Sequence, residues 1–342
     1  MGWEIKITLA VTTSEHLPPV LEVDELASSS SDCDGESLAS STVSLTESIN
    51  EHVYANGRRY HRKSEGQYAL PSDETEMNRL DLVHLQLLTL GGDLHKAPIQ
   101  GDPLNVLDCG TGTGIWALDF GDLHKGSRVL GVDLIPNQPT WTFPNVTFEI
   151  DDVEKPWTYS QRFDFIHSRH LATSIRDWPS YLTQIFTHLT PGGFVEISEH
   201  NLDTLHSDDA TLPPTSPLLT YMSCLRSGLL AAGVNPDLQG ADYKRMLEEA
   251  GFVDVQLRAY KIPWGAWAKN RTYKMVGAIL GDVAATGIEA HGLQLMTAVL
   301  GMTEGEARRV CGEAVEGVRT GREHAYHWQW QVWGRKPVEG EE

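Results

Sequence analysis

The chain has 342 residues, of which 40% are hydrophobic and 22% are charged, the composition of an ordinary globular protein. Its 27 Lys and Arg residues stand against 47 Asp and Glu residues, so the formal net charge is −20. Because phosphate binding depends on Lys and Arg that neutralise a polyanion, this balance argues against a sequence-independent nucleic-acid binder and against a protein of anionic membrane surfaces.

The first part of the chain differs from the rest. Residues 1–51 hold ten acidic residues against Lys6 alone, together with many Ser and Thr residues. Such a segment buries too little apolar surface to offset its ordering entropy, so we expect residues 1–53 to form a disordered, acidic, Ser-rich tail. The tail is interpreted as a solubilising extension, and the alternative is a phosphorylatable arm that binds a protein partner. One domain is predicted over residues 54–337, followed by a short disordered end over residues 338–342.

Strands and helices alternate between residues 72 and 201. A helix is predicted to begin after Ser72 as its N-cap, with acidic residues in the first turn. Two further helices are predicted over 116–120 and 181–189. Five apolar strands are predicted at 105–108, 128–133, 146–150, 163–167 and 194–198. Strands joined by helical crossovers favour a parallel sheet with both faces covered, so the predicted fold class is α/β and doubly wound.

Beyond residue 201 the alternation loosens, and two insertions on the substrate side are predicted over residues 202–235 and 262–320. A helix over 242–250 precedes a sixth strand over 253–259, whose apolar residues alternate. Residues 272–320 are predicted to be helical, and Thr303 with Glu306 forms a capping-box pattern. A last strand is predicted over 326–332.

A glycine-rich stretch follows the first of these strands, and it reads Asp108-Cys109-Gly110-Thr111-Gly112-Thr113-Gly114. Glycines are needed where the backbone turns sharply and where a ligand approaches it closely. The G-x-G-x-G spacing differs from the G-x-G-x-x-G of dinucleotide binders, and no Lys-Ser or Lys-Thr follows as in a phosphate-binding loop. A carboxylate at Asp108 would repel a pyrophosphate and attract an ammonium group, which fits S-adenosyl-L-methionine with its ammonium and sulfonium charges.

Acidic residues also end the next two strands. Asp133 follows Gly114 by nineteen residues, a spacing at which a carboxylate accepts the ribose hydroxyls in the related dinucleotide fold. Asp151 and Asp152 end the third strand, where a carboxylate can accept from the adenine amino group. A single Asp at a strand end is common turn chemistry, but three at successive strand ends behind this glycine pattern favour a cofactor site.

These stretches resemble the class I S-adenosylmethionine-dependent methyltransferases, and among them the fungal LaeA-like methyltransferases. Besides the glycine stretch, the resemblance is carried by residues 66–74, 131–134, 163–169, 189–194, 324–326 and 335–337. It spans about residues 54–337. The resemblance implies a seven-stranded, mostly parallel sheet with an antiparallel last strand, and an enzyme that transfers the methyl group of S-adenosyl-L-methionine.

The resemblance also implies a set of cofactor contacts and no metal ion. The residues that match the family's cofactor-binding positions are Asp108, Gly110, Gly112, Gly114, Asp133, Asp152, the backbone of Val153, and Ser168 or Arg169. Tyr68 resembles the family's N-terminal residue that closes over the cofactor.

Methyl transfer from a sulfonium is an in-line displacement, so alignment and exclusion of water carry much of the acceleration. A general base is needed only where the acceptor must lose a proton. Candidate bases at the carboxyl edge of the sheet are His170 after the fourth strand, and Glu199 and His200 after the fifth. His200 is the first choice, and the alternative for a loop histidine is plain solvation.

The acceptor pocket is expected to come from the two insertions. Its predicted apolar liners are Met222, Trp264, Trp267, Tyr273 and Met275, and the alternative for Met275 is the core stripe of a helix. The predicted function is methylation of a small molecule at O, N or C in fungal secondary metabolism. The alternative is a LaeA-type regulator that works in a nuclear protein complex. A nicotinamide-dependent oxidoreductase is disfavoured by the glycine spacing.

The cysteine pattern concerns the compartment. Four cysteines, Cys33, Cys109, Cys224 and Cys311, are scattered without a C-x-x-C pair, which argues against a disulfide framework and a zinc site. No apolar run approaches the roughly 18–20 residues of a membrane span. We therefore expect a cytoplasmic protein, with the nucleus as the second candidate compartment.

Overall fold

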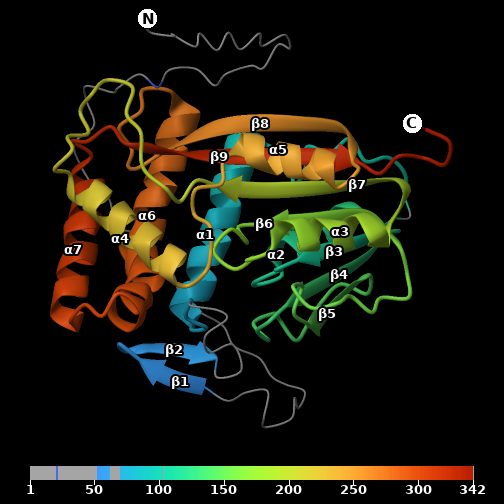
Figure 1. The fold of residues 1–342 in the computed structure, drawn as a ribbon, viewed down its shortest axis with the longest axis horizontal. Helices are drawn as coiled ribbons and strands as arrows, with labels where there is room; N and C mark the ends of the chain where they lie inside the picture. Colours follow the sequence, from blue (N-terminus) through green and yellow to red (C-terminus); the bar gives the residue numbers. More distant parts are fainter. Residues whose placement is uncertain (1–20, 22–51, 62–69, 103, 342) are drawn as a thin grey trace, which may run out of the picture.

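The computed structural model describes residue 21 and residues 52–61, 70–102 and 104–341 (Figure 1). Its centre is a seven-stranded sheet with the strand order β5-β4-β3-β6-β7-β9-β8. The strands are β3 (Asn105–Cys109), β4 (Arg128–Asp133), β5 (Val146–Ile150), β6 (Phe163–Arg169), β7 (Leu189–His200), β8 (Val253–Pro263) and β9 (Tyr326–Arg335). β9 pairs antiparallel with β7 and β8, whereas the other pairs are parallel, so the predicted fold class is confirmed.

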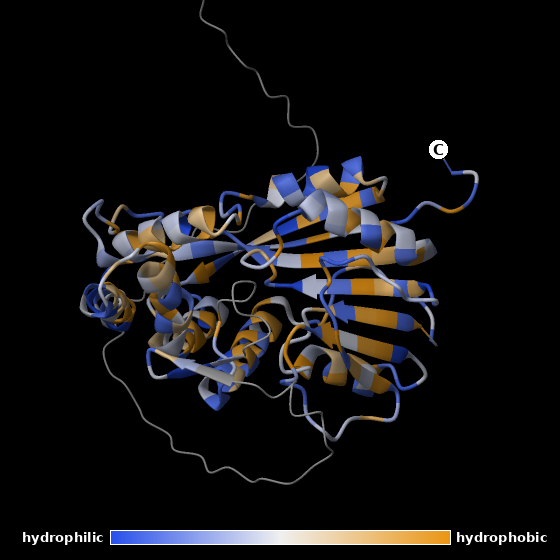
Figure 2. Cartoon of the chain, turned by 60° about the horizontal axis from the view of Figure 1, so that its bottom comes forward, coloured by the Kyte–Doolittle hydropathy of each residue, from blue (hydrophilic) through white to orange (hydrophobic). Residues whose placement is uncertain are grey.

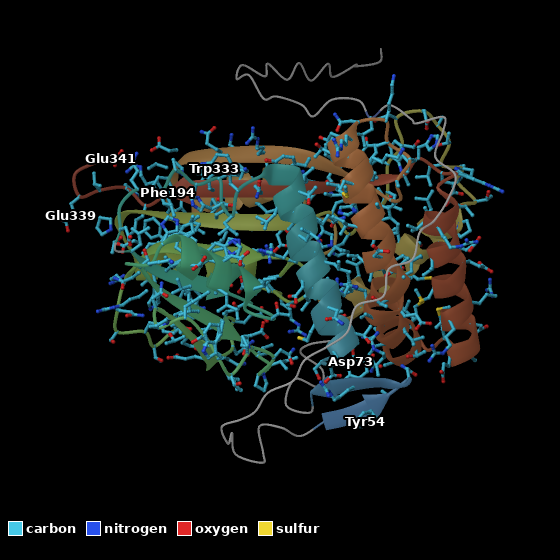
Figure 3. All side chains as sticks on the ribbon, turned by 180° about the vertical axis from the view of Figure 1, so that it is seen from behind. Tyr54, Asp73, Phe194, Trp333, Glu339 and Glu341 are labelled. Atoms are coloured by element: carbon cyan, nitrogen blue, oxygen red, sulfur yellow. The ribbon has the colours of Figure 1, made fainter. Side chains whose placement is uncertain are left out.

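Helices cover both faces of the sheet because side chains alternate along its strands. On β3, Leu107 packs towards α3 (Trp178–His188) and α5 (Gly240–Glu249), whereas Val106 packs towards α2 (Ile115–Leu123). Figure 2 shows the strands as largely apolar bands between these layers. Phe194 of β7 and Trp333 of β9, labelled in Figure 3, pack against the cluster around α2. The sheet is therefore buried on both sides, as parallel sheets require.

The strand order reverses between β3 and β6, since β4 and β5 lie on one side and β7 lies on the other. Doubly wound folds bind ligands outside the carboxyl ends of the strands at such a point. A group of helices lies beside these carboxyl ends (Figure 1). It comprises α1 (Glu74–Gly91), α4 (Pro217–Ala231), α6 (Arg271–Gln294) and α7 (Glu304–Thr320). These helices share a second apolar core, separate from the clusters on the two sheet faces.

The helices of the two predicted insertions agree with the prediction to different degrees. The helical prediction over 272–320 is confirmed by α6 and α7, which are joined through the π-helical turn η3 (Leu295–Val299). Thr303 and Glu306 form the predicted capping box. Helix α4 within 202–235 was not predicted, although Ser216 caps it and Pro217 occupies its first turn. A serine at the N-cap and a proline in the first turn are typical of the start of a helix.

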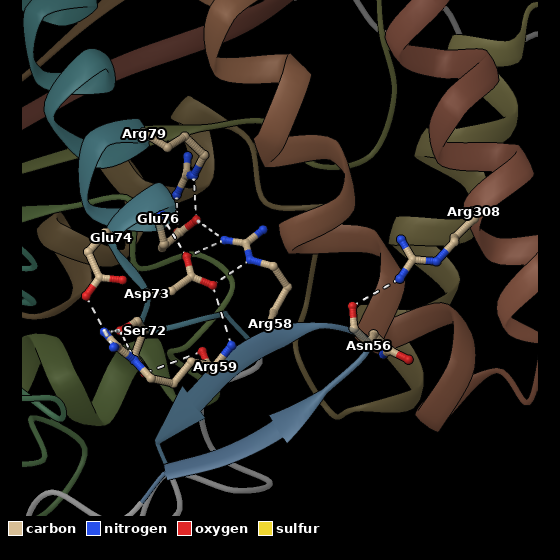
Figure 4. A network of polar contacts seen from close by, with 9 residues as sticks. All are labelled: Asn56, Arg58, Arg59, Ser72, Asp73, Glu74, Glu76, Arg79 and Arg308. Atoms are coloured by element: carbon tan, nitrogen blue, oxygen red, sulfur yellow. Dashed lines mark hydrogen bonds and ion pairs between the residues drawn. The ribbon is translucent and has the colours of Figure 1, made fainter. Parts of the chain in front are cut away.

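An antiparallel hairpin of β1 (His52–Ala55) and β2 (Arg58–His61), absent from the prediction, lies beside the start of α1. Arg58 donates from Nε and Nη2 to the two carboxylate oxygens of Asp73, at 2.6 and 2.8 Å. Asp73 also accepts from the N–H of Glu76 at 3.0 Å, so Asp73 is the N-cap and the prediction of Ser72 is wrong. One carboxylate therefore caps α1 and holds the hairpin (Figures 3 and 4).

The predicted tail falls mostly on residues 1–20 and 22–51, which lie outside the described residues, as do Cys33 and Tyr68. Leu21 is described and is only 6% exposed. Its N–H donates to Oδ2 of Asp208 at 3.1 Å, and its side chain packs in a cluster with Trp267 and Tyr326. Leu21 itself is therefore held against the folded domain.

The ends of the predicted domain also differ slightly from the structure. β1 begins at His52, two residues before the predicted start at residue 54. Glu341, within the end predicted to be disordered, pairs with Arg335 at 2.6 Å. Among the described cysteines, Cys109, Cys224 and Cys311 are free thiols. Within the described residues, no helix is both long enough and apolar enough to span a bilayer.

Candidate active site

The loop between β3 and α2 forms one end of the site. Gly110 and Gly114 have φ angles of 68° and 81°, in the left-handed region that favours glycine. A Cβ at Gly110 would lie 2.4 Å from Cδ2 of Leu171, and a Cβ at Gly114 would lie 2.4 Å from Cζ of Phe148. These two positions therefore need glycine both for the turn and for close packing. The loop thus presents bare backbone at the carboxyl edge of the sheet.

Asp108 is buried behind this loop and is not one of the residues that line the main cavity. Its carboxylate accepts from Oγ1 of Thr111 at 2.6 Å and is 2.7 Å from Nδ1 of His167. His167 stacks on Trp116, with ring centroids 3.8 Å apart and 5° between the planes. Burial lowers the pKa of His167, so its neutral ring donates Nδ1–H to Asp108. In this structure the carboxylate of Asp108 holds the loop from behind, and its contact with the cofactor stays a prediction.

Asp133, at the end of β4, does line the cavity. Its carboxylate accepts from the N–H groups of Gly112 and Ile135, at 2.8 and 3.1 Å. Burial raises the pKa of Asp133 to about 6. A smaller adjoining cavity, which shares Gly110 and Asp133 as walls, continues along Asp152 and Val153. The structure thus places the predicted ribose contact and the predicted adenine contacts on the walls of two neighbouring cavities.

The main cavity runs from the glycine loop to the helical group. Met222 and Trp264 line it, as predicted. Trp267 packs near Leu21 instead, and Tyr273 is partly buried against the same cluster. Met275 is 50% exposed, so neither its pocket interpretation nor its core interpretation holds. The other apolar residues of the wall are Leu70, Leu80, Val83, Ile115, Leu171, Leu202, Tyr221, Leu225, Leu280, Val283, Ala284 and Ile288.

Four histidines line the helical end of this cavity: His170, His200, His291 and His327. The ring of His200 lies 4.6 Å from that of His170 and 5.5 Å from that of His327. Burial lowers the pKa of all four, to about 3 for His200 and His291, so the rings are neutral near pH 7. His170 has a φ of 55°, and strain of this kind in a non-glycine residue concentrates at functional sites.

The neighbours of three of these rings determine which nitrogen carries the proton. Nδ1 of His291 is 2.8 Å from the carbonyl oxygen of Gly287, which only accepts, so Nε2 keeps a lone pair. The indole N–H of Trp264 donates to Nδ1 of His327, so Nε2 of His327 carries the hydrogen. The neutral rings therefore present one further acceptor and one further donor.

The third ring, His170, is oriented by Gln329. The amide nitrogen of Gln329 donates to Oγ of Ser198 at 3.0 Å, so its oxygen accepts from Nε2–H of His170 at 3.0 Å. Nδ1 of His170 therefore keeps a lone pair. Nδ1 of His200 is buried and, within the described part of the chain, has no hydrogen-bond partner. Two predicted candidate bases, His170 and His200, thus stand side by side as neutral rings, each with one nitrogen that keeps a lone pair.

Glu199, the third predicted base, lies elsewhere. Its carboxylate accepts from the N–H groups of Leu171 and Ala172, at 2.6 and 3.1 Å. Glu199 is fully buried and does not line the main cavity, and burial raises its pKa to about 8. The side chain at this strand position points under the loop and holds it in place, so the structure does not bring Glu199 together with the two histidines at the cavity.

Of the two residues predicted after β6, Arg169 lines the main cavity and Ser168 is fully buried away from it. Nη1 of Arg169 donates to Nδ1 of His84 at 3.1 Å, and Nε2 of His84 is 3.0 Å from Asp119. Gly114, likewise, does not line either cavity and acts as the N-cap of α2. Alternation along a strand explains the difference between Ser168 and Arg169.

Arg79, His291 and His327 also line the cavity, although no sequence pattern predicts them as site residues. Arg79 lies on α1 and is 6% exposed, and its Nε and Nη2 donate to Glu76 at 3.0 and 2.6 Å. His291 stands on α6 and His327 on β9, and neither belongs to a motif. Apart from His170 and His200, the chain has ten other histidines, and nothing in the local sequence distinguishes His291 and His327 from those ten. Only the folded arrangement does.

A doubly wound sheet with an antiparallel β9, a glycine loop after β3 and an acid after β4 defines the class I S-adenosylmethionine-dependent methyltransferases. The bare loop backbone and the carboxylate of Asp133 fit that cofactor, whose methyl group is carried on a sulfonium. The chain is an enzyme of this class.

Comparison with known proteins agrees with this assignment. Residues 76–257 match the methyltransferase domain family, and the chain belongs to that family. It is 39% identical to methyltransferase pytC of Aspergillus terreus over 304 residues, covering 87% of this chain and 90% of that protein. It is 33% identical to secondary metabolism regulator LAE1 of Cochliobolus heterostrophus over 295 residues, covering 81% of this chain and 92% of that protein.

Proposed function

We propose that this methyltransferase acts on a small molecule of fungal secondary metabolism, which binds at the histidine-lined end of the main cavity. The observation that carries the proposal is the continuity of that cavity. One space connects Gly112 and Asp133 with His170, His200 and Trp264. A small acceptor placed among the histidines can therefore meet a methyl group held above the loop, as in-line transfer requires.

The proposed cofactor contacts follow from the walls. The backbone at Gly110 and Gly112 faces the amino-acid end, and Asp133 accepts the ribose hydroxyls. Asp152 and the backbone of Val153 contact the adenine, and Arg169 lies beside the loop. Asp108, Gly114 and Ser168 line neither cavity, and they are proposed to support the cofactor-binding residues from behind. Tyr68, outside the described residues, is proposed to close over the cofactor.

His200 is proposed as the general base where the acceptor must lose a proton, with His170 as the second choice. His200 stands between His170 and His327, and its Nδ1 is unpartnered within the described residues. A neutral imidazole takes up the proton of an acceptor hydroxyl as the oxygen attacks. Glu199 is proposed as a positioning residue, because it fixes the loop that carries Leu171.

The test is transfer of tritium from methyl-labelled S-adenosyl-L-methionine into a metabolite extract of the source strain lacking this gene. We expect label in the organic-soluble small molecules with the full chain, and none with Asp133→Asn. The matched control is Asp122→Asn, an exposed position on α2, which should transfer label normally. Label that appears only in precipitated protein would contradict the proposal.

The similarity to LAE1 favours one second candidate, a regulator of secondary metabolism that binds a protein partner through its N-terminal tail. The acceptor cavity with its basic nitrogens supports an enzyme of small molecules instead. Metabolite profiles of a deletion strain separate the two. Accumulation of one unmethylated intermediate supports the enzyme, whereas loss of many unrelated metabolites, together with partners lost on removal of residues 1–51, supports the regulator. Both candidates place the protein in the cytoplasm or nucleus.

A further inference from the structure

The geometry points to an acceptor that carries an acidic hydroxyl, either a carboxylic acid or an acidic phenol or enol, attached to an apolar body. This inference rests on the proposed function and names its substrate class. It follows from the charges that line the main cavity and from the hydrogen-bonding groups at its histidine-lined end. The methylated atom is then the oxygen of that hydroxyl.

Three charged residues line the main cavity within the described ranges of the chain: Arg79, Arg169 and Asp133. Asp133 lies at the cofactor end, where it is bonded to Gly112 of the glycine loop. Arg169 is directed to His84 and lies near Asp81, Asp108 and Asp119. Arg169 also helps to lower the pKa of His170, the histidine next to it in the chain, whereas Arg79 acts on His200 and His291. Both charges near the histidine end are therefore positive, and Arg79 is the one that acts on His200 and His291.

Arg79, which lines the main cavity, belongs to a chain of ion pairs that begins at the β1–β2 hairpin (Figure 4). Arg58 pairs with Asp73, Glu76 pairs with Arg79, and Nη2 of Arg58 lies 4.0 Å from Glu76. The charges of these two arginines and two carboxylates sum to zero, but it is the guanidinium of Arg79 that stands at the cavity. Glu76 takes Nε and Nη2 of Arg79, and the described residues provide no partner for Nη1. Arg79 can therefore donate to an oxygen anion in the cavity.

An amine acceptor would be disfavoured here. At neutral pH an alkylamine is an ammonium ion, and at the histidine end it would meet Arg79, whereas Asp133, the one Asp or Glu among the described wall residues, lies at the cofactor end. Like charges in a poorly solvated space repel strongly. An oxygen anion, by contrast, is attracted by Arg79, and Nε2–H of His327 supplies another donor. The cavity thus favours a negatively charged acceptor group over a positively charged one.

The weak basicity of the histidines points the same way. The cation of Arg79 adds to burial in lowering the pKa of His200 and His291. Imidazoles of this kind remove a proton readily only from an acidic hydroxyl. The lone pairs of His170 and His291 accept that proton or a hydrogen bond from it. An acceptor that arrives already ionised needs no base at all.

The transfer balances in atoms and electrons. The O–H bond of the acceptor breaks and its proton passes to an imidazole nitrogen or, for an ionised acid, has already passed to water. The oxygen uses a lone pair to form the bond to the methyl carbon. The carbon–sulfur bond breaks, and its electron pair stays on sulfur as a neutral thioether. The product is a methyl ester or methyl ether.

The rest of this end of the cavity is apolar. Tyr221, Met222 and Leu225 come from α4, and Leu280, Val283 and Ile288 come from α6. Such walls bury the hydrocarbon part of a ligand, while a few polar groups fix its orientation. The acceptor is therefore an apolar molecule with its acidic group directed to Arg79.

The test uses the full chain saturated with S-adenosylhomocysteine and four naphthalene probes of one shape. The probes are 2-naphthoate, 2-naphthol, 2-naphthamide and 2-naphthylmethylammonium, and calorimetry measures their dissociation constants. We expect naphthoate or naphthol to bind at least about tenfold more tightly than the amide and the ammonium. The ratio of naphthoate to naphthol distinguishes a carboxylic acid from a phenol as the preferred acceptor.

Arg79→Gln should abolish this preference, whereas Arg245→Gln, a surface arginine of α5 paired with Asp242, should keep it. If Arg79→Gln does not fold, the double variant Glu76→Gln with Arg79→Gln is tested in its place, because it removes both charges of the ion pair. Equal binding of the ammonium and the acids, no binding of either acid, or a preference unchanged by the Arg79 variants would overturn the inference. Failure of S-adenosylhomocysteine itself to bind would instead overturn the proposed function.

Discussion

Replacement of Gly114 by alanine tests the packing of the glycine loop most sharply. At a φ of 81° a side chain is strained, which costs about 1–2 kcal/mol. The new Cβ would also lie 2.4 Å from Cζ of Phe148, and overpacking of this kind costs about 1–3 kcal/mol. The free energy of unfolding should therefore fall by about 2–5 kcal/mol, the sum of the two costs.

Gly112→Ala is the matched control for this substitution. Its φ is 60°, but a Cβ there would be 3.5 Å from Cδ1 of Leu80, an ordinary contact. Its cost should be the backbone part alone, about 1–2 kcal/mol, measured by urea unfolding of the protein without cofactor. Phe148→Leu combined with Gly114→Ala should recover part of the loss. Equal costs for Gly112→Ala and Gly114→Ala would refute the reasoning about Phe148.

Three further predictions concern other parts of the fold. The pKa of Glu199 rises from 4.5 to about 8 on folding, so its contribution to stability is present at low pH and is lost as pH rises between these values. Glu199→Gln should therefore flatten the decline in unfolding free energy between pH 5.5 and 7.5, by at most about 1.4 kcal/mol per pH unit, and an unchanged slope would contradict it. Thr303→Ala should cost about 1 kcal/mol in urea unfolding because it removes the cap of α7, whereas the exposed Thr320→Ala should cost less than about 0.5 kcal/mol. Leu21→Ala should cost about 1–2 kcal/mol if that residue fastens the tail, and an unchanged Tm would argue against the anchor.

The parts of the fold that follow from local pattern were predicted correctly. The ends of β4 and β5 coincide with the predicted strands, because apolar runs bounded by turn residues define them. The capping box of Thr303 is equally local. The hairpin of β1 and β2 was missed because its short, polar strands carry no apolar alternation, and ion pairs with Asp73 hold it.

The site divides in the same way. The glycine spacing and the acid at Asp133 are signals within one stretch of sequence, and both reach the cavity wall. Arg79, His291 and His327 come from α1, α6 and β9, and tertiary packing alone brings them together. Glu199 and Asp108 look like site residues in the sequence, but neither lines the main cavity. Their carboxylates accept hydrogen bonds from Leu171 and Thr111 of the neighbouring loops. Whether an acidic residue at a strand end reaches the cavity depends on the direction of its side chain, and the sequence pattern does not determine that direction.

The central claim is that S-adenosyl-L-methionine binds between the glycine loop and Asp133. Calorimetric titration of the full chain with this cofactor tests it directly, with Asp133→Asn beside the exposed Asp122→Asn. We predict one site in the unmodified chain and in Asp122→Asn. In Asp133→Asn binding should weaken by about 10- to 100-fold, the effect of losing hydrogen bonds to a charged group. No binding to the unmodified chain, or equal affinity in Asp133→Asn, would contradict the account.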